Sequence, residues 1–152
     1  FSFLRQYPDW LFPGKSDQDP SQSPLHIPCE YLLDPLNPFT WLRTARRVKQ
    51  ENPDVLLLQW WVTYWAPVWF LITRYIRARH QARILFICHN IFPHEQHVWD
   101  KPLARWVLTA GDSFGVHSEA DRRRLLSILP KASVRVVPMP SHASFSQSVK
   151  GH

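Results

Sequence analysis

Residues 83–95 read RILFICHNIFPHE, and this stretch decides the fold. Its first six residues are mostly branched or aromatic, as in a buried strand, and the Asn and Pro that follow are typical of a turn. Ligands of open α/β sheets bind outside the carboxyl ends of the strands, so polar residues at this end indicate a site. We therefore single out His89, Asn90, His94 and Glu95 as candidate site residues.

Apolar runs and helical periodicities alternate along the rest of the chain. Asn37 before Pro38 is typical of a helix start, and so is Ser118 with Asp121 three residues later. Strand and helix alternate four times, which calls for right-handed crossovers and a parallel sheet. The sequence thus predicts an α/β, Rossmann-like fold, a parallel sheet with helices on both faces. Strands are expected near 1–7, 25–27, 55–59, 84–88, 113–117 and 134–137, and helices near 38–51, 65–80, 100–110 and 119–129.

Three local features carry more specific expectations. The run Val55–Gln59 is almost wholly apolar, which predicts a strand buried on both faces. Asp100 is expected to cap the helix that follows it, and Gly111 is expected to supply the turn after that helix.

Val55–Thr73 contains no charged residue and is long enough to cross a bilayer. However, Gln59, Thr63 and Pro67 interrupt it, and its aromatic residues lie in its middle instead of in two interfacial belts. We therefore interpret it as a strand, a sharp turn and a helix.

Polar or aromatic residues lie at the ends of three of the four later strands, and Pro138 follows the fourth. If the sheet is parallel, these residues lie along one edge and form a cleft. They are Gln59, Trp60, Trp61, His89, Asn90, His117, Ser118 and Pro138.

Each candidate also has a structural interpretation. His89 could bond a backbone carbonyl at the strand end, and Asn90 could simply begin the turn. His94 and Glu95 could form an exposed pair in a loop. Trp60 and Trp61 could belong to the core, and Ser118 could act only as a helix cap, although a capped helix start also offers backbone N–H groups to an anion.

Composition excludes several function classes. Four glycines at 14, 111, 115 and 151 leave no dinucleotide or Walker loop, and no GxSxG elbow occurs. His89, His94 and His97 near Cys88 are conceivable zinc ligands, but their spacing fits no usual zinc pattern, so we expect no metal. Cys29 and Cys88 make no disulfide framework, and Cys88 is expected in the core.

The net charge of +6 is unevenly distributed, because residues 1–37 carry −3 and residues 38–152 carry +9. A basic region of this kind suits an anionic membrane, a phosphate-bearing substrate or nucleic acid. No nucleic-acid-binding motif occurs, so we expect no nucleic-acid partner. A second hypothesis is a membrane-surface binding module without catalysis, with an aromatic and basic face formed by Trp65, Trp69, Arg74 and Arg77.

Three motifs, taken in order, resemble a known family. They are FICHNIFPHE at 86–95, AGDSFGVHS at 110–118 and VRVVP at 134–138. They resemble the N-terminal domain of bacterial glycosyltransferases of the family-4 type, which have the two-domain GT-B fold. The segments RQYP at 5–8 and FPGK at 12–15 also look like this group, so the resemblance covers nearly the whole chain.

The resemblance implies a retaining hexosyl transfer from a nucleotide-sugar donor to a glycan or lipid-linked acceptor, with no bound metal or tightly bound cofactor. It implies a role in polysaccharide biosynthesis for the cell envelope, in the cytoplasm or peripherally on the inner face of the plasma membrane. His89 would be the catalytic residue beside donor sugar and acceptor. The residues expected to bind substrate are Gln59, Trp60, Trp61, Asn90, His94, Glu95 and Ser118.

The chain departs from the family pattern at both ends. The first strand with its Gly-rich loop and the C-terminal, nucleotide-binding domain have no counterpart in it. We therefore expect residues 1–140 to form an acceptor-side domain without its first strand, and residues 141–152 to begin an interdomain linker. A chain of this kind is expected to transfer no sugar by itself.

Overall fold

The computed structural model describes residues 1–4, 28–79, 81–92 and 97–138. These residues group into two compact units, which we describe separately: residues 1–53 with 67–82, and residues 54–66 with 83–152. The strand expected at 25–27, the site candidates His94 and Glu95, and the linker expected at 141–152 lie outside the described residues.

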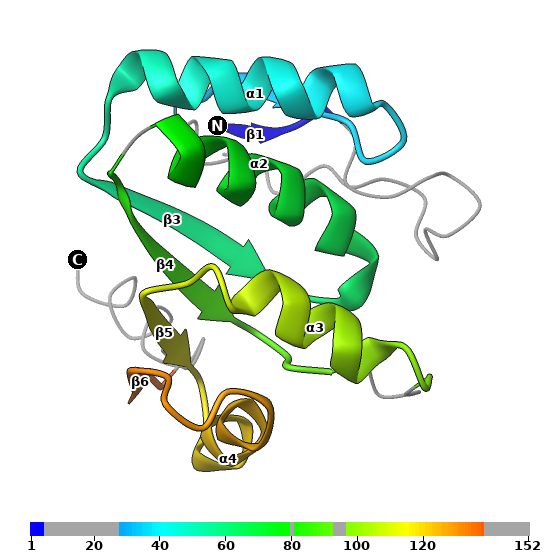
Figure 1. The fold of residues 1–152 in the computed structure, drawn as a ribbon, viewed down its shortest axis with the longest axis vertical. Coiled ribbons are helices and arrows are strands. Elements are labelled where there is room, and N and C mark those ends of the chain that lie inside the picture. The colour runs from blue at the N-terminus through cyan, green and yellow to red at the C-terminus, as the bar shows by residue number, and fades with distance from the viewer. Residues whose placement is uncertain (5–27, 80, 93–96, 139–152) are drawn as a thin grey trace, which may run out of the picture. The chain divides into compact units, whose positions relative to one another are not determined.

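The first unit contains two short parallel strands and two helices (Figure 1). Strand β1 (Ser2–Phe3) lies within the strand expected near residues 1–7. It pairs with β2 (Tyr31–Leu33), a strand that the sequence did not predict. Helix α1 (Pro38–Glu51) begins as expected, because the Asn37 side chain accepts a hydrogen bond from the Phe39 N–H at 3.1 Å. It ends at Asn52, whose φ of 48° gives a left-handed cap. Helix α2 (Ala66–Arg79) carries Pro67 in its first turn, as predicted.

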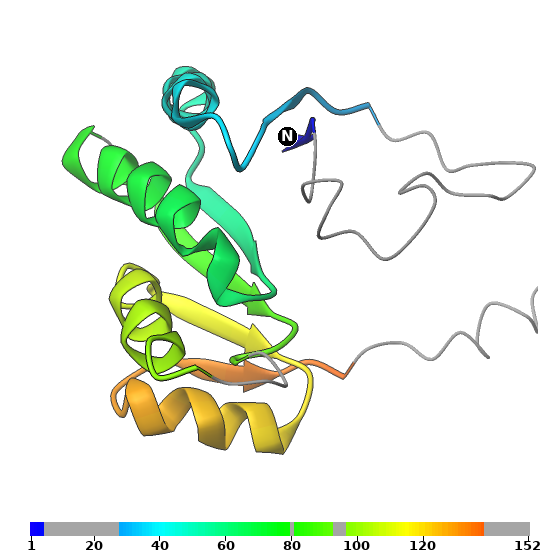
Figure 2. The same cartoon turned by 90° about the vertical axis from the view of Figure 1, so that its right-hand side faces the viewer.

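The second unit is built on a four-stranded parallel sheet. The strand order is β3 (Val55–Trp60), β4 (Arg83–Cys88), β5 (Ser113–Val116) and β6 (Val134–Val136). Helix α3 (Asp100–Leu108) connects β4 to β5, and helix α4 (Glu119–Ile128) connects β5 to β6. In Figure 2 the arrowheads of these strands point the same way, so their carboxyl ends share one edge. The predicted α/β, Rossmann-like class is confirmed.

Strand β3 is not buried on both faces, contrary to the prediction. Leu58 and Trp60 are buried, whereas the alternate residues Val55 and Leu57 are each 53% exposed. Side chains of a strand alternate between its two faces, so Val55 and Leu57 lie on the face opposite to Leu58 and Trp60, and that face is left partly open. In the order of this sheet β3 is also the first strand, with β4 as its one partner there. An apolar run is typical of a central strand, but the sequence did not reveal this edge position.

Asp100 does not cap α3 in the expected way. Trp99 occupies the cap position, without a side-chain hydrogen bond. The buried Asp100 carboxylate accepts instead from the Thr63 hydroxyl, in the 3-10 turn η1 (Thr63–Trp65), and from the His97 N–H at 2.6 Å. It therefore ties the start of α3 to the turn after β3, a long-range role that local spacing cannot reveal.

Gly111 does not supply a left-handed turn, because no described glycine has a positive φ. Its role is steric. A Cβ atom at this position would lie 2.7 Å from Cζ of Phe114 and 2.8 Å from Cδ2 of Phe86. These two rings are stacked with their centroids 6.0 Å apart, so glycine allows their close packing against the backbone.

The substitution Gly111→Ala is expected to lower the free energy of unfolding by about 1–3 kcal/mol, because two buried rings must shift to admit the methyl group. Gly115→Ala is a matched control. Its Cβ would meet Cδ1 of Ile87 at 2.8 Å, the mobile end of a flexible side chain, so the loss should be smaller. Urea denaturation of both variants measures the difference, and equal losses would contradict the steric explanation.

The interpretation of Val55–Thr73 as strand, turn and helix is confirmed by β3, η1 and α2. Within the described parts of the chain, no helix has the length and apolar character needed to cross a membrane. The aromatic and basic face proposed for a membrane-surface module is not formed. Trp65 is 3% exposed and Trp69 is 5% exposed, so neither indole is available to a lipid surface.

Candidate functional site

The residues that follow the four strands of the second unit meet at one edge of the sheet. Trp61 follows β3, His89 follows β4, His117 follows β5 and Val137 follows β6. Backbone hydrogen bonds extend the ladders past the strands: the His89 N–H donates to the Trp60 carbonyl at 2.9 Å, and the Val137 N–H donates to the Val116 carbonyl at 2.7 Å. The register of the sheet therefore fixes the spacing of these residues.

Two imidazoles form the centre of this edge. Nε2 of His117 lies 3.2 Å from Nδ1 of His89, and the ring centroids are 4.8 Å apart. The indole of Trp61 packs against His89, with the ring centroids 5.0 Å apart and the ring planes tilted by 60°. Its Nε1–H donates to Oε1 of Gln59 at 3.0 Å. We call Gln59, Trp61, His89 and His117 the strand-end cluster.

His89 carries a buried nitrogen, Nε2, that has no hydrogen-bond partner among the described residues. Buried polar atoms of native proteins are nearly always bonded, so such an atom marks a place where a ligand or water belongs. Burial lowers the pKa of His89, and the neighbouring His117 lowers it further. Both causes oppose the charged form, so His89 is a neutral imidazole near pH 7.

This pKa shift predicts how stability depends on pH. Since the folded pKa lies below the unfolded value of about 6.5, the unfolded chain takes up the proton first as pH falls. This uptake lowers the free energy of unfolding. The loss is absent above about pH 7.5 and grows as pH falls through 6.5 toward the folded pKa. Urea denaturation between pH 7.5 and 5 should show a shallower decline in His89→Gln than in the wild type. Parallel declines would contradict the shift.

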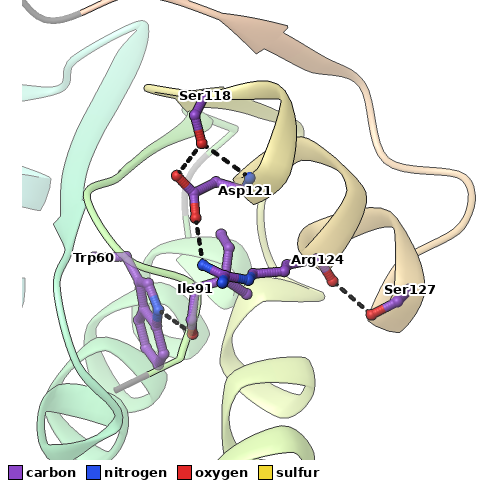
Figure 3. A network of polar contacts seen from close by, with 6 residues as sticks. All are labelled: Trp60, Ile91, Ser118, Asp121, Arg124 and Ser127. Atoms are coloured by element: carbon purple, nitrogen blue, oxygen red, sulfur yellow. Dashed lines mark hydrogen bonds and ion pairs between the residues drawn. The ribbon is translucent and has the colours of Figure 1, made fainter. Parts of the chain in front are cut away.

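Trp60 supports the cluster from within the core and does not line it. Its side chain is fully buried, and its Nε1–H donates to the carbonyl of Ile91 at 3.2 Å (Figure 3). This bond fixes the segment that follows His89. The structure therefore corrects the expectation that Trp60 contacts a substrate. Cys88 is also fully buried, as predicted, and burial raises the pKa of its thiol to about 12.

Ser118 is a helix cap, which was the structural interpretation of this residue. Its hydroxyl accepts from the Asp121 N–H at 3.1 Å and donates to Oδ2 of Asp121 at 2.6 Å (Figure 3). The other carboxylate oxygen of Asp121 bonds Arg124 at 3.2 Å. Because the hydroxyl uses its donor and one acceptor in the cap, the expected direct role of Ser118 in substrate binding is not supported by its geometry.

Of the remaining candidates, only Asn90 is described, and it is not part of the cluster. Asn90 is exposed at the start of the loop after His89, and His94 and Glu95 fall in the gap of the described chain. His97 stacks on Trp99 with ring centroids 4.7 Å apart. Across the described ranges, no three His, Cys, Asp or Glu side chains lie close enough together to hold a metal ion.

The sequence placed His117 at the edge of the sheet but not among the residues expected to catalyse transfer or bind substrate, although it lies at the centre of the cluster. A signal was present, because His117 follows β5 directly, as His89 follows β4. The Val137 carbonyl, which contacts His117, carries no sequence signal, since any residue supplies a carbonyl.

A hollow of about 350 Å³ lies away from this cluster, near the C-terminal ends of α3 and α4. Its lining is mostly apolar and contains no residue of the strand-end cluster, so we do not assign the site to it. The lining residues are Arg105, Leu108, Thr109, Gly111, Phe114, Ile128, Leu129, Pro130, Lys131 and Ala132.

Comparison with known proteins gives one result. The family model described as Glycosyltransferase Family 4 matches residues 8–140, which is most of the chain. No curated protein and no solved structure matches the chain.

Proposed function

Since the chain belongs to Glycosyltransferase Family 4, we propose that it forms the acceptor-side domain of a retaining hexosyltransferase. The donor is a nucleotide sugar, and the acceptor is a glycan or a lipid-linked glycan of the cell envelope. The observation that carries the proposal is the strand-end cluster, in which His89 holds an unpartnered, buried nitrogen at the carboxyl edge of a parallel sheet. That edge is where open α/β sheets bind ligands.

The chemistry of the cluster suits a sugar. In the transfer, the bond between the anomeric carbon and the phosphate oxygen breaks, and the acceptor oxygen bonds that carbon. The acceptor proton leaves with the nucleoside diphosphate. A neutral His89 contributes by holding a sugar hydroxyl and steadying the partial charge of an oxocarbenium-like centre. The indole of Trp61, 37% exposed, offers an apolar face to the sugar C–H groups.

The proposed location is the cytoplasm or the inner face of the plasma membrane, where lipid-linked acceptors are reached. The sequence feature that supports it is the net charge of +6, since basic proteins are attracted to anionic membrane surfaces. No tightly bound cofactor and no metal are part of the proposal.

The proposed function is tested by measuring transfer in the transferase that carries this domain. A panel of nucleotide hexoses is offered with glycan and lipid-linked acceptors, and the anomeric configuration of the product is compared with that of the donor by NMR. We expect one donor to be used with its configuration retained. An inverted product would overturn the retaining mechanism, and the absence of transfer from every donor would overturn the proposed function.

A further inference from the structure

The hydrogen bonds around the strand-end cluster fix which nitrogen of each imidazole carries a proton. The Val137 carbonyl can only accept, so Nδ1 of His117, 2.9 Å away, must donate to it. A neutral imidazole carries one N–H, so Nε2 of His117 is then an acceptor. Nδ1 of His89, 3.2 Å from that atom, must therefore be the donor. Nε2 of His89 is left with a lone pair.

The reverse hydrogen bond, donated by Nε2 of His117 to Nδ1 of His89, would require a doubly protonated His117 that donates from both nitrogens. Within the described chain no carboxylate bonds either imidazole, so no anionic partner there favours that direction. The arrangement in which each ring carries one proton satisfies both described contacts of the pair.

We propose that His117 is a positioning residue that holds His89 in its Nδ1–H tautomer, so that Nε2 of His89 accepts a hydrogen bond from a hydroxyl group of the bound substrate. The buried, unpartnered Nε2 is the atom that this arrangement leaves for the ligand. The inference rests on the proposed function and narrows it. The lone pair of Nε2 cannot bond an ionised phosphate oxygen, which also only accepts, so the group held at this point is a hydrogen-bond donor. Hydroxyl groups are the donors that every sugar offers.

The backbone of Val137 sets the tautomers of both histidines. Val137 follows β6, the last strand of the sheet, and its own N–H is held by Val116 of the neighbouring strand. Its carbonyl is thus fixed by the ladder and cannot turn away without breaking it. Partners of this kind, which orient a functional histidine through its other nitrogen, are typically worth 10- to 100-fold in affinity or activity at metal sites.

The tautomers are measured directly in the chain by long-range 1H–15N correlation spectra of 15N-labelled histidines at about pH 8, where the neutral forms dominate. Single substitutions assign the signals. We expect both His89 and His117 as Nδ1–H tautomers. In His117→Phe, which keeps a ring but removes the acceptor, His89 should shift toward the Nε2–H tautomer. His97→Phe, a control in an exposed histidine, should leave His89 unchanged.

Wild-type His89 with its proton on Nε2 would overturn the proposal, and so would an unchanged His89 in His117→Phe. This result does not depend on any transfer assay. If the tautomers are as expected and no donor supports transfer, the positioning by His117 stands and the transferase assignment fails.

A second measurement separates positioning from a merely structural role. The amide of His117→Gln can donate to Val137 and accept from His89, whereas the ring of His117→Phe can do neither. We expect kcat/KM for transfer to fall by about 10-fold in His117→Phe and to recover substantially in His117→Gln. An equal loss in both variants, with folding retained, would overturn the proposal.

Discussion

Replacing His89 by alanine is expected to lower kcat/KM for sugar transfer by about 100-fold, the usual effect of losing one preorganised polar group at a reacting centre. The substitution removes the lone pair of Nε2, an atom that no group of the described chain hydrogen-bonds and that is therefore free to bind substrate. It removes no core side chain, because His89 is half-buried at the edge of the sheet. The free energy of unfolding should therefore change little.

His97→Ala is the matched control for this experiment. The His97 side chain is 56% exposed and does not belong to the strand-end cluster, so transfer should remain near the wild-type level. Steady-state kinetics of both variants, beside their denaturation curves, give the comparison. Wild-type turnover in His89→Ala would assign His89 a structural role and contradict the proposed site.

The pH profile of the wild type provides an independent check on the same residue. Protonation of Nε2 removes the lone pair, and burial together with His117 holds the pKa of His89 below its usual value of 6.5. Transfer should therefore be retained as pH falls to 6.5 and decline only below it. A loss of kcat centred above pH 7 would require a different titrating group.

Trp60→Ala is expected to lower the free energy of unfolding by about 3–5 kcal/mol, the largest stability effect that we predict. Trp60 is among the largest fully buried side chains, and its Nε1–H bonds the Ile91 carbonyl. Alanine would leave a cavity and an unpaired buried carbonyl. Since this bond also fixes the segment after His89, the variant should lose transfer activity even at temperatures where it remains folded.

The adjacent Trp61 is the matched control, since it has the same side chain on the other face of the strand. It is 37% exposed, and among the described residues its indole donates to the exposed Gln59 and packs beside the half-buried His89. Trp61→Ala should therefore cost less than about 1 kcal/mol of unfolding free energy. Denaturation in urea, followed by circular dichroism, measures both. Similar losses in the two variants would contradict the assignment of Trp60 to the core.

The features that the sequence predicted correctly depend on residues close together in the chain. Asn37 caps α1 and Ser118 caps α4 through bonds that span two or three residues, so their spacing is readable directly. The alternation of strands and helices indicated a parallel sheet, because a crossover between adjacent parallel strands needs an intervening segment of this length. A parallel sheet in turn places the strand ends, and with them His89, at one edge.

The incorrect or missing expectations concern contacts between distant parts of the chain. Which face of β3 is covered depends on what packs against the sheet, and residues 55–60 do not encode this by themselves. Asp100 bonds Thr63, 37 residues away, and this partner displaces the local cap that its position suggested. Gly111 is required by two aromatic rings on neighbouring strands, a packing reason that a turn rule does not contain.

The sequence by itself determined the α/β class, the bounds of the main helices within a few residues, and the position of His89 directly after a strand. Only the tertiary structure decided what His89 can do. Its partner His117 lies 28 residues further along the chain, and the carbonyl that orients His117 belongs to Val137, a further 20 residues on. Periodicity and capping are read over a few residues, whereas the register of four paired strands sets which ring nitrogen meets which acceptor.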